Sequence, residues 1–176
     1  MKILFLILLN LYLQVYESNL KLWDSNSKII WSDFNGNIPE NKGFKKAVTS
    51  SKISIKSSFY EGEIPKYIIR SYFNKDKSWT ITNSKEDLIH ERLHFDITEL
   101  YARKIRKKMD SLSKMEERDI HCYKVAYKKI LKGLQDTQYQ YDNESYSSNI
   151  KQQEWQSKVA KELEELKEYE YIPNNE

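Results

Sequence analysis

The residues whose types and spacing could do chemistry are two histidines and the glutamate that follows the first of them, His90, Glu91 and His94. Residues four apart on an α-helix lie one turn apart on the same face, so both imidazoles can bind one metal ion. Glu91 can then take a proton from water that the ion activates. The chain has three histidines in 176 residues, and two of them belong to this motif. The motif predicts a zinc site with His90 and His94 as ligands and Glu91 as general base.

A site of this type needs a third protein ligand, and the spacing leaves its identity open. The longer H-E-x-x-H-x-x-G-x-x-H pattern is excluded, because Ile97 and Leu100 occupy its glycine and last histidine positions. The candidates are later carboxylates and one imidazole: Glu116, Glu117, Asp119, His121, Asp142 and Glu144. The main alternative for the motif itself is a pair of surface histidines.

The motif lies in a segment with helical periodicity. Ser84, three residues before an aspartate, is typical of a helix N-cap. The apolar arc of this helix, which we expect to run to about Met109, consists of Ile89, Leu93, Ile97 and Leu100. His90, His94 and Tyr101 form a stripe on the edge of that arc. Their position predicts a site that faces a cleft.

The elements around this helix indicate an α+β fold, in which a small antiparallel N-terminal sheet is followed by three long helices. Residues 20–79 are strand-like, with β-prone runs at Lys28–Trp31, Val48–Phe59, Tyr67–Phe73 and Ser78–Ile81. The second and third helices are expected at about residues 113–139 and from residue 149 to about residue 169. We expect the polar segment between them, residues 140–148, to be a loop.

Composition limits the class of protein. The 29 basic and 26 acidic residues are spread evenly and give a net charge of +3, which is not the footprint of a nucleic-acid-binding protein. One cysteine, Cys122, excludes an internal disulfide. Few breakers, four glycines and three prolines, favour long helices. We expect residues 20–176 to form a single domain.

The N-terminus differs from the rest of the chain. Met1 and Lys2 precede an apolar run, Ile3–Leu13, that is shorter than the about 20 residues of a membrane span. A positive charge followed by a short apolar stretch is the layout of a secretory signal peptide. We therefore expect residues 1–19 to be an export signal, cleaved between Tyr16 and Asn19. The mature chain is then periplasmic or extracellular, without a stable membrane span. A buried first strand or helix is the alternative.

Several further segments carry a resemblance that covers nearly the whole mature chain. They are Ile30–Gly36, Ala47–Ser51, Tyr72–Trp79, His90–Lys104, Tyr141–Ser145 and Gln153–Trp155. With these residues the chain resembles a bacterial family of unknown function whose members are predicted secreted zinc-dependent proteases. The resemblance implies a zincin-like active-site helix, Zn²⁺ as cofactor and a peptide or protein substrate.

The chain departs from that family at one position. There, a Tyr-Asp-x-Glu-Thr segment is followed two residues later by a histidine, a plausible third zinc ligand. Here the corresponding residues are Ser145 and Ser147, so Asp142, Glu144, His121 or Glu117 would have to replace it. Two hypotheses follow: a secreted zinc-dependent peptidase, or a catalytically degenerate envelope protein that keeps the fold and binds a partner. The substrate and the oligomeric state are not encoded in any motif.

Overall fold

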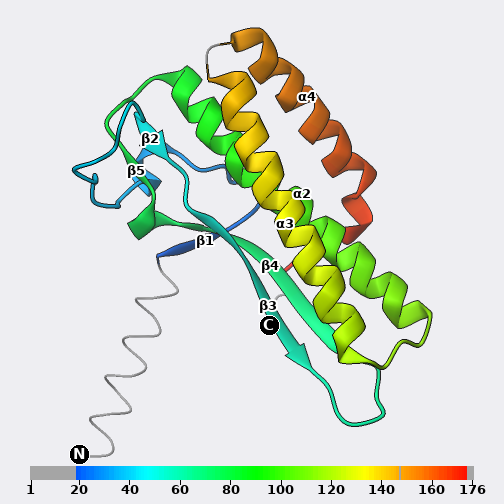
Figure 1. Cartoon of the computed structure of the whole chain (residues 1–176). Coiled ribbons are helices and arrows are strands. Elements are labelled where there is room, and N and C mark those ends of the chain that lie inside the picture. Colours follow the sequence, from blue (N-terminus) through cyan, green and yellow to red (C-terminus); the bar gives the residue numbers. More distant parts are fainter. Residues whose placement is uncertain (1–18, 147, 174–176) are drawn as a thin grey trace, which may run out of the picture.

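A computed structural model describes residues 19–146 and 148–173 (Figure 1). Two predictions therefore concern residues outside the described ranges. One is the signal peptide, of whose residues 1–19 the structure describes Asn19 alone. The other is the serine at the position of the family histidine, Ser147.

Two small antiparallel sheets form the N-terminal part. In the larger one, β4 (Lys66–Asn74) pairs with β1 (Leu20–Leu22) on one side and with β3 (Ser51–Ser58) on the other. In the smaller one, β2 (Ala47–Val48) pairs with β5 (Trp79–Thr80). The register of β3 and β4 runs from Ser51 opposite Phe73 to Ser58 opposite Lys66. The strands predicted from the alternating patterns around residues 48–59, 67–73 and 78–81 are thus confirmed.

The β-prone run Lys28–Trp31 is not a strand, so that prediction was wrong. Its last residue begins a short 3₁₀ helix, η1 (Trp31–Asp33). The Asp33 carboxylate accepts a hydrogen bond from the Ile30 amide at 3.0 Å and a second from Lys21 Nζ at 3.0 Å. These bonds close a turn at a place where apolar composition alone favoured extended backbone.

Three helices follow the sheets: α2 (Lys85–Lys114), α3 (Ile120–Ser145) and α4 (Asn149–Glu165), with a terminal 3₁₀ turn, η3 (Lys167–Tyr169). The α+β fold is confirmed. Each α-helix begins at a side chain that accepts a hydrogen bond from an otherwise unpaired backbone amide: Ser84, Asp119 and Ser148. The cap predicted at Ser84 is confirmed, since its hydroxyl accepts from the Asp87 amide at 3.1 Å.

The loop expected at residues 140–148 is largely helical, which is the second correction. Helix α3 continues to Ser145 because two residues of this polar segment are buried: Tyr141 packs against α2 and α4, and Ser145 lies beside His90 of α2. The connection to α4 is consequently very short. This extension matters for function, because it places Asp142 on a helix rather than in a loop.

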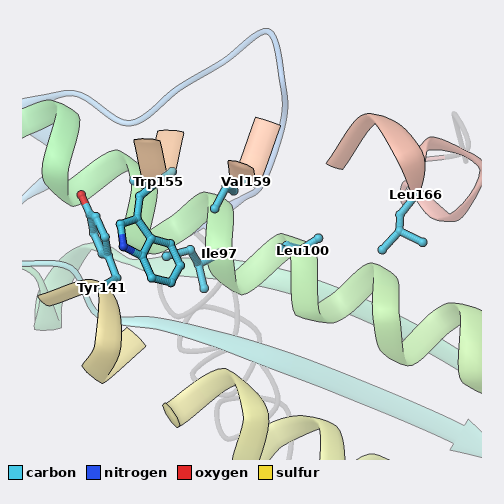
Figure 2. Packing of buried hydrophobic residues seen from close by; sticks show 7 residues of the cluster. Ile97, Leu100, Tyr141, Trp155, Val159 and Leu166 are labelled. Atoms are coloured by element: carbon cyan, nitrogen blue, oxygen red, sulfur yellow. The ribbon is translucent and has the colours of Figure 1, made fainter. Parts of the chain in front are cut away.

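Helix α2 is the element on which the others pack, with α3 and α4 beside it and the sheet beneath (Figure 1). Leu93, Ile97 and Leu100 are buried as the periodicity predicted, whereas Ile89 is exposed. These three side chains form a core with Tyr141 of α3 and with Trp155, Val159 and Leu166 (Figure 2). A second core joins the sheet to α2 and α3. The histidine-bearing turns of α2 therefore rest on a rigid, packed support.

Within the described ranges, no helix combines the length and the apolar character that crossing a bilayer requires.

Candidate metal centre

His90 and His94 lie one turn apart near the N-terminal end of α2, as the spacing predicted. Their Nε2 atoms are 3.1 Å apart, and their rings meet edge to face with centroids 4.8 Å apart. Both side chains are largely but not fully buried, with 20% and 13% of their surface exposed. The two imidazoles thus present the same kind of atom to one point that solvent can reach.

Asp142 of α3 completes the group. Its Oδ1 lies 2.8 Å from His94 Nε2 and 3.3 Å from His90 Nε2. Ligand atoms bound tetrahedrally to zinc at 2.0–2.1 Å are about 3.3 Å from one another, so the donor set fits such an ion with small adjustments. Among the described residues, these three side chains form a group that could hold a metal ion. Of the candidates for a third ligand, the structure brings Asp142 to the histidines.

The electrostatics of the group favour a cation. A carboxylate oxygen and two neutral imidazole nitrogens all offer lone pairs, and lone pairs at such distances repel unless a proton or metal ion lies between them. Burial would raise the pKa of Asp142, but the two imidazoles beside its carboxylate, whenever one of them carries the extra proton, together lower it. The pKa of His94 is raised although burial opposes it, because Asp142 and the charge of Glu91 favour the imidazolium. Both shifts run in the direction that a positive charge between these side chains would favour.

Each histidine also has a partner for its other nitrogen. Gln138 Oε1 lies 2.5 Å from His94 Nδ1, and Ser145 Oγ lies 3.4 Å from His90 Nδ1. Both partners come from α3, one turn before and almost one turn after Asp142. Partners of this kind orient metal-binding imidazoles and hold the binding nitrogen toward the metal.

Tyr141 forms the wall behind the histidines. Its ring stacks on His90 with centroids 4.6 Å apart and meets the edge of His94 at 4.9 Å. On its other side it contacts Trp155 of α4 (Figure 2), with centroids 5.7 Å apart. Tyr141 is fully buried. The stacked contact of Tyr141 with His90 and its edge-to-face contact with Trp155 hold the imidazole against the core.

Glu91 is buried beside the site. One of its carboxylate oxygens, Oε2, has no hydrogen-bond partner among the described residues. Its backbone oxygen accepts a bond from Thr49 Oγ1 at 3.0 Å, which ties this turn of α2 to the segment between β2 and β3. A buried carboxylate oxygen without a donor is costly unless a ligand or water supplies one. The arrangement is suited to a base that receives a proton.

The remaining candidates for a third ligand lie elsewhere. Glu116, Glu117 and Asp119 belong to the turn between α2 and α3, at the far end of both helices. His121 is 21 residues before Asp142 on α3, about 31 Å along the helix axis. Glu144 is near in sequence, but its carboxylate accepts from Gln140 Nε2 and from Trp155 Nε1. None of these side chains joins the two histidines.

Three residues that position the histidines were missed in the sequence: Gln138, Tyr141 and Ser145. The sequence did carry a signal for Gln138, because Gln138 and Asp142 are four residues apart, as His90 and His94 are. The signal was hidden by the assignment of residues 140–148 to a loop. Once α3 extends through Ser145, these polar residues fall on one face, toward the histidine pair of α2.

Compared with known protein families, curated proteins and solved structures, the chain matches none of them. The family resemblance noted in the sequence therefore stays a prediction. What can be said of function comes from the geometry of the site.

Proposed function

We propose that this protein is an exported zinc-dependent peptidase. The observation that carries the proposal is the convergence of His90, His94 and Asp142 beside Glu91, whose buried carboxylate oxygen lacks a donor. Two imidazoles and a carboxylate are a common donor set for hydrolytic zinc sites, with a position left for water or substrate. Export rests on the apolar run Ile3–Leu13, and the peptide substrate rests on the motif and the family resemblance.

The roles of the side chains follow from their positions. His90, His94 and Asp142 would hold the ion, which, when bound, supplies a Lewis acid that activates water and polarises a carbonyl group. Glu91 accepts the proton of the attacking water and returns it to the amine that leaves as the peptide bond breaks. Tyr141 keeps water away from the inner side of His90 and holds its ring in place. Solvent and substrate approach from the Asp142 side, since that side chain is 44% exposed.

The alternative is a protein that keeps this fold, has a degenerate site and binds a partner. Asp142 favours hydrolysis over this alternative, because it supplies the third donor that the sequence lacked at Ser147. Zinc also suits this set better than Mg²⁺ or Ca²⁺, which prefer oxygen donors.

The test separates metal binding from catalysis. Purified protein should contain about one zinc per chain, and a His90→Ala/His94→Ala variant should contain almost none. Glu91→Gln keeps nearly the same shape and should retain zinc but lose peptide hydrolysis by a factor of at least about 100, the scale of general base catalysis. Equal, substoichiometric zinc in wild type and double variant would refute the site. Full zinc loading without turnover across a broad peptide library would favour the binding protein.

A further inference from the structure

We infer that Gln138 is a positioning residue that holds His94 in the tautomer with its proton on Nδ1, so that Nε2 keeps the lone pair a metal ion needs. The inference rests on the metal site of the proposed function. It concerns, however, an arrangement of the protein's own atoms that can be tested without metal and without activity.

The orientation of the Gln138 amide follows from its neighbours. Its Nε2 lies 2.8 Å from the backbone oxygen of His94. A backbone carbonyl carries no hydrogen, so the NH₂ end of the amide must face it. The amide oxygen then faces His94 Nδ1 at 2.5 Å, and it too carries no hydrogen. The proton of this hydrogen bond therefore belongs to Nδ1.

A chain of hydroxyl groups holds the amide in that orientation. Thr98 donates to the backbone oxygen of His94 at 3.1 Å, so its own oxygen is free to accept. It accepts from Gln138 Nε2 at 3.2 Å and from Ser51, at the start of β3, at 2.6 Å. The network links β3, α2 and α3. Rotating the amide by half a turn would place its oxygen against a carbonyl oxygen and break two bonds at once.

The alternative tautomer would close the site. In a neutral imidazole one nitrogen is a donor and the other an acceptor. With the proton on Nε2, His94 would donate directly to Asp142 Oδ1, which lies 2.8 Å away. Two ligands would then satisfy each other, and a metal ion would have to break their bond. Gln138 disfavours this closed state, because it would leave the amide oxygen facing a bare Nδ1 lone pair.

The two histidines differ in this respect. His90 Nδ1 lies 3.4 Å from Ser145 Oγ, whose own proton goes to the Tyr141 backbone oxygen at 2.6 Å. That contact is longer than an ordinary hydrogen bond of this type. The tautomer of His94 is therefore the more strongly fixed, and Gln138 is the side chain whose loss should matter most.

The experiment compares Gln138→Leu with Gln138→Glu, and uses Gln140→Leu as control. Gln140 lies on the same helix, and its amide bonds the exposed Glu144. Long-range ¹H–¹⁵N spectra of the metal-free protein in alkaline buffer, where imidazoles are neutral, assign the tautomer. Wild type and the control should show the proton of His94 on Nδ1. Gln138→Glu should show it too, because one carboxylate oxygen still accepts from Nδ1, while the other, which can no longer donate to the His94 carbonyl, can turn to accept from the Thr98 hydroxyl. Gln138→Leu should populate the Nε2–H form and bind zinc about 10–100-fold more weakly.

Three results would overturn the inference. One is a wild-type His94 with its proton on Nε2, and another is a Gln138→Leu protein that matches wild type in tautomer and zinc affinity. If Gln138→Leu does not fold, Gln138→Glu decides, and an Nε2–H tautomer there is the third. A wild type with the Nδ1–H tautomer that binds no zinc would support the positioning role and refute the proposed function instead.

Discussion

Helix α2 carries two buried polar clusters, and they are built on opposite principles. The first is the metal centre of His90, His94 and Asp142. The second lies two turns further along, where Glu99, Arg103 and Arg106 are buried or nearly so. Both begin with a pair of side chains four residues apart on α2, and both reach a later part of the chain. The two clusters differ in whether hydrogen-bond donors or further acceptors face their acceptor atoms.

In the second cluster every donor meets an acceptor. Arg103 Nε donates to Glu99 Oε1 at 3.0 Å and Arg106 donates to the same oxygen at 2.9 Å, while the Ser71 hydroxyl bonds the other oxygen. Other N–H groups of the same two arginines donate to the Glu170 carboxylate and to three backbone oxygens, those of Ile69, Leu163 and Tyr169. In the metal centre, acceptors face acceptors and a carboxylate oxygen of Glu91 has no donor. A cluster that satisfies itself holds the fold together, and one that requires an added cation is built to bind.

The largest expected effect is on stability, from a change in the Glu99 cluster. Glu99→Ala should lower the free energy of unfolding by about 3–5 kcal/mol, because it leaves two buried guanidinium groups without their shared carboxylate. Urea denaturation followed by circular dichroism measures the change. Zinc affinity of the fraction that remains folded should be unchanged.

The isosteric variant Glu99→Gln sharpens this prediction. It keeps the shape and one acceptor oxygen, so its loss of stability isolates the charge. If Glu99→Ala instead abolished zinc binding while stability hardly changed, the division of the two clusters into structural and binding sites would be wrong.

The second prediction concerns the metal centre, where a substitution should weaken zinc binding and hardly change stability. Asp142→Ala should weaken zinc binding more than about 100-fold, because loss of an outer partner alone already costs roughly 10–100-fold. Without metal, its stability should differ from wild type by less than about 1 kcal/mol, since the removed side chain is half exposed and surface contacts contribute little. Calorimetric titration with zinc and denaturation in chelator measure the two quantities.

A matched control for that variant exists on the same helix. Asp136 is exposed and paired with Lys132 four residues away, and it does not touch the histidines. Asp136→Ala should change neither zinc affinity nor stability appreciably. Equal zinc binding by the Asp136 and Asp142 variants would remove Asp142 from the ligand set.

The comparison also shows which parts of the site a sequence can predict. The motif turn of α2 was accessible because its signals are local: a cap at Ser84, a 3.6-residue period, and two histidines with fixed spacing. The second half of the site depends on contacts between residues far apart, 44 between His94 and Gln138 and 52 between His90 and Asp142. No local pattern encodes such distances.

The mistaken loop at residues 140–148 has a physical cause. This segment is rich in polar residues with low helix propensity, so local preference favours a break. It is helical because Tyr141 and Ser145 are buried, and tertiary packing outweighs propensity. The error removed Asp142 from the face that it shares with Gln138. The sequence alone did not show that Tyr141 and Ser145 are buried by other helices, and that burial is what extends α3.

A third polar cluster provides the smallest and last prediction. Asp33 accepts from Lys21 and from the Ile30 amide and lies near Lys75, so its donors and acceptors match, as in the Glu99 cluster. Burial would raise the pKa of Asp33, but these hydrogen bonds and charges together lower it below the usual 3.8. An acid with a lowered folded-state pKa stabilises the protein fully above its unfolded pKa, and this stability is lost as pH falls through the folded pKa.

Asp33→Asn should therefore lower the unfolding free energy by on the order of 1 kcal/mol at neutral pH, the scale of one hydrogen bond. The difference from wild type should shrink as the pH falls below about 4, where the aspartate of the unfolded chain becomes protonated. Thermal unfolding of both proteins between neutral and acidic pH measures it. Zinc affinity at neutral pH should be equal in the two proteins, because Asp33 contributes to the fold through paired charges and takes no part in the metal centre. A difference in stability that grew toward acidic pH would mean that Asp33 is not stabilised by its lysines.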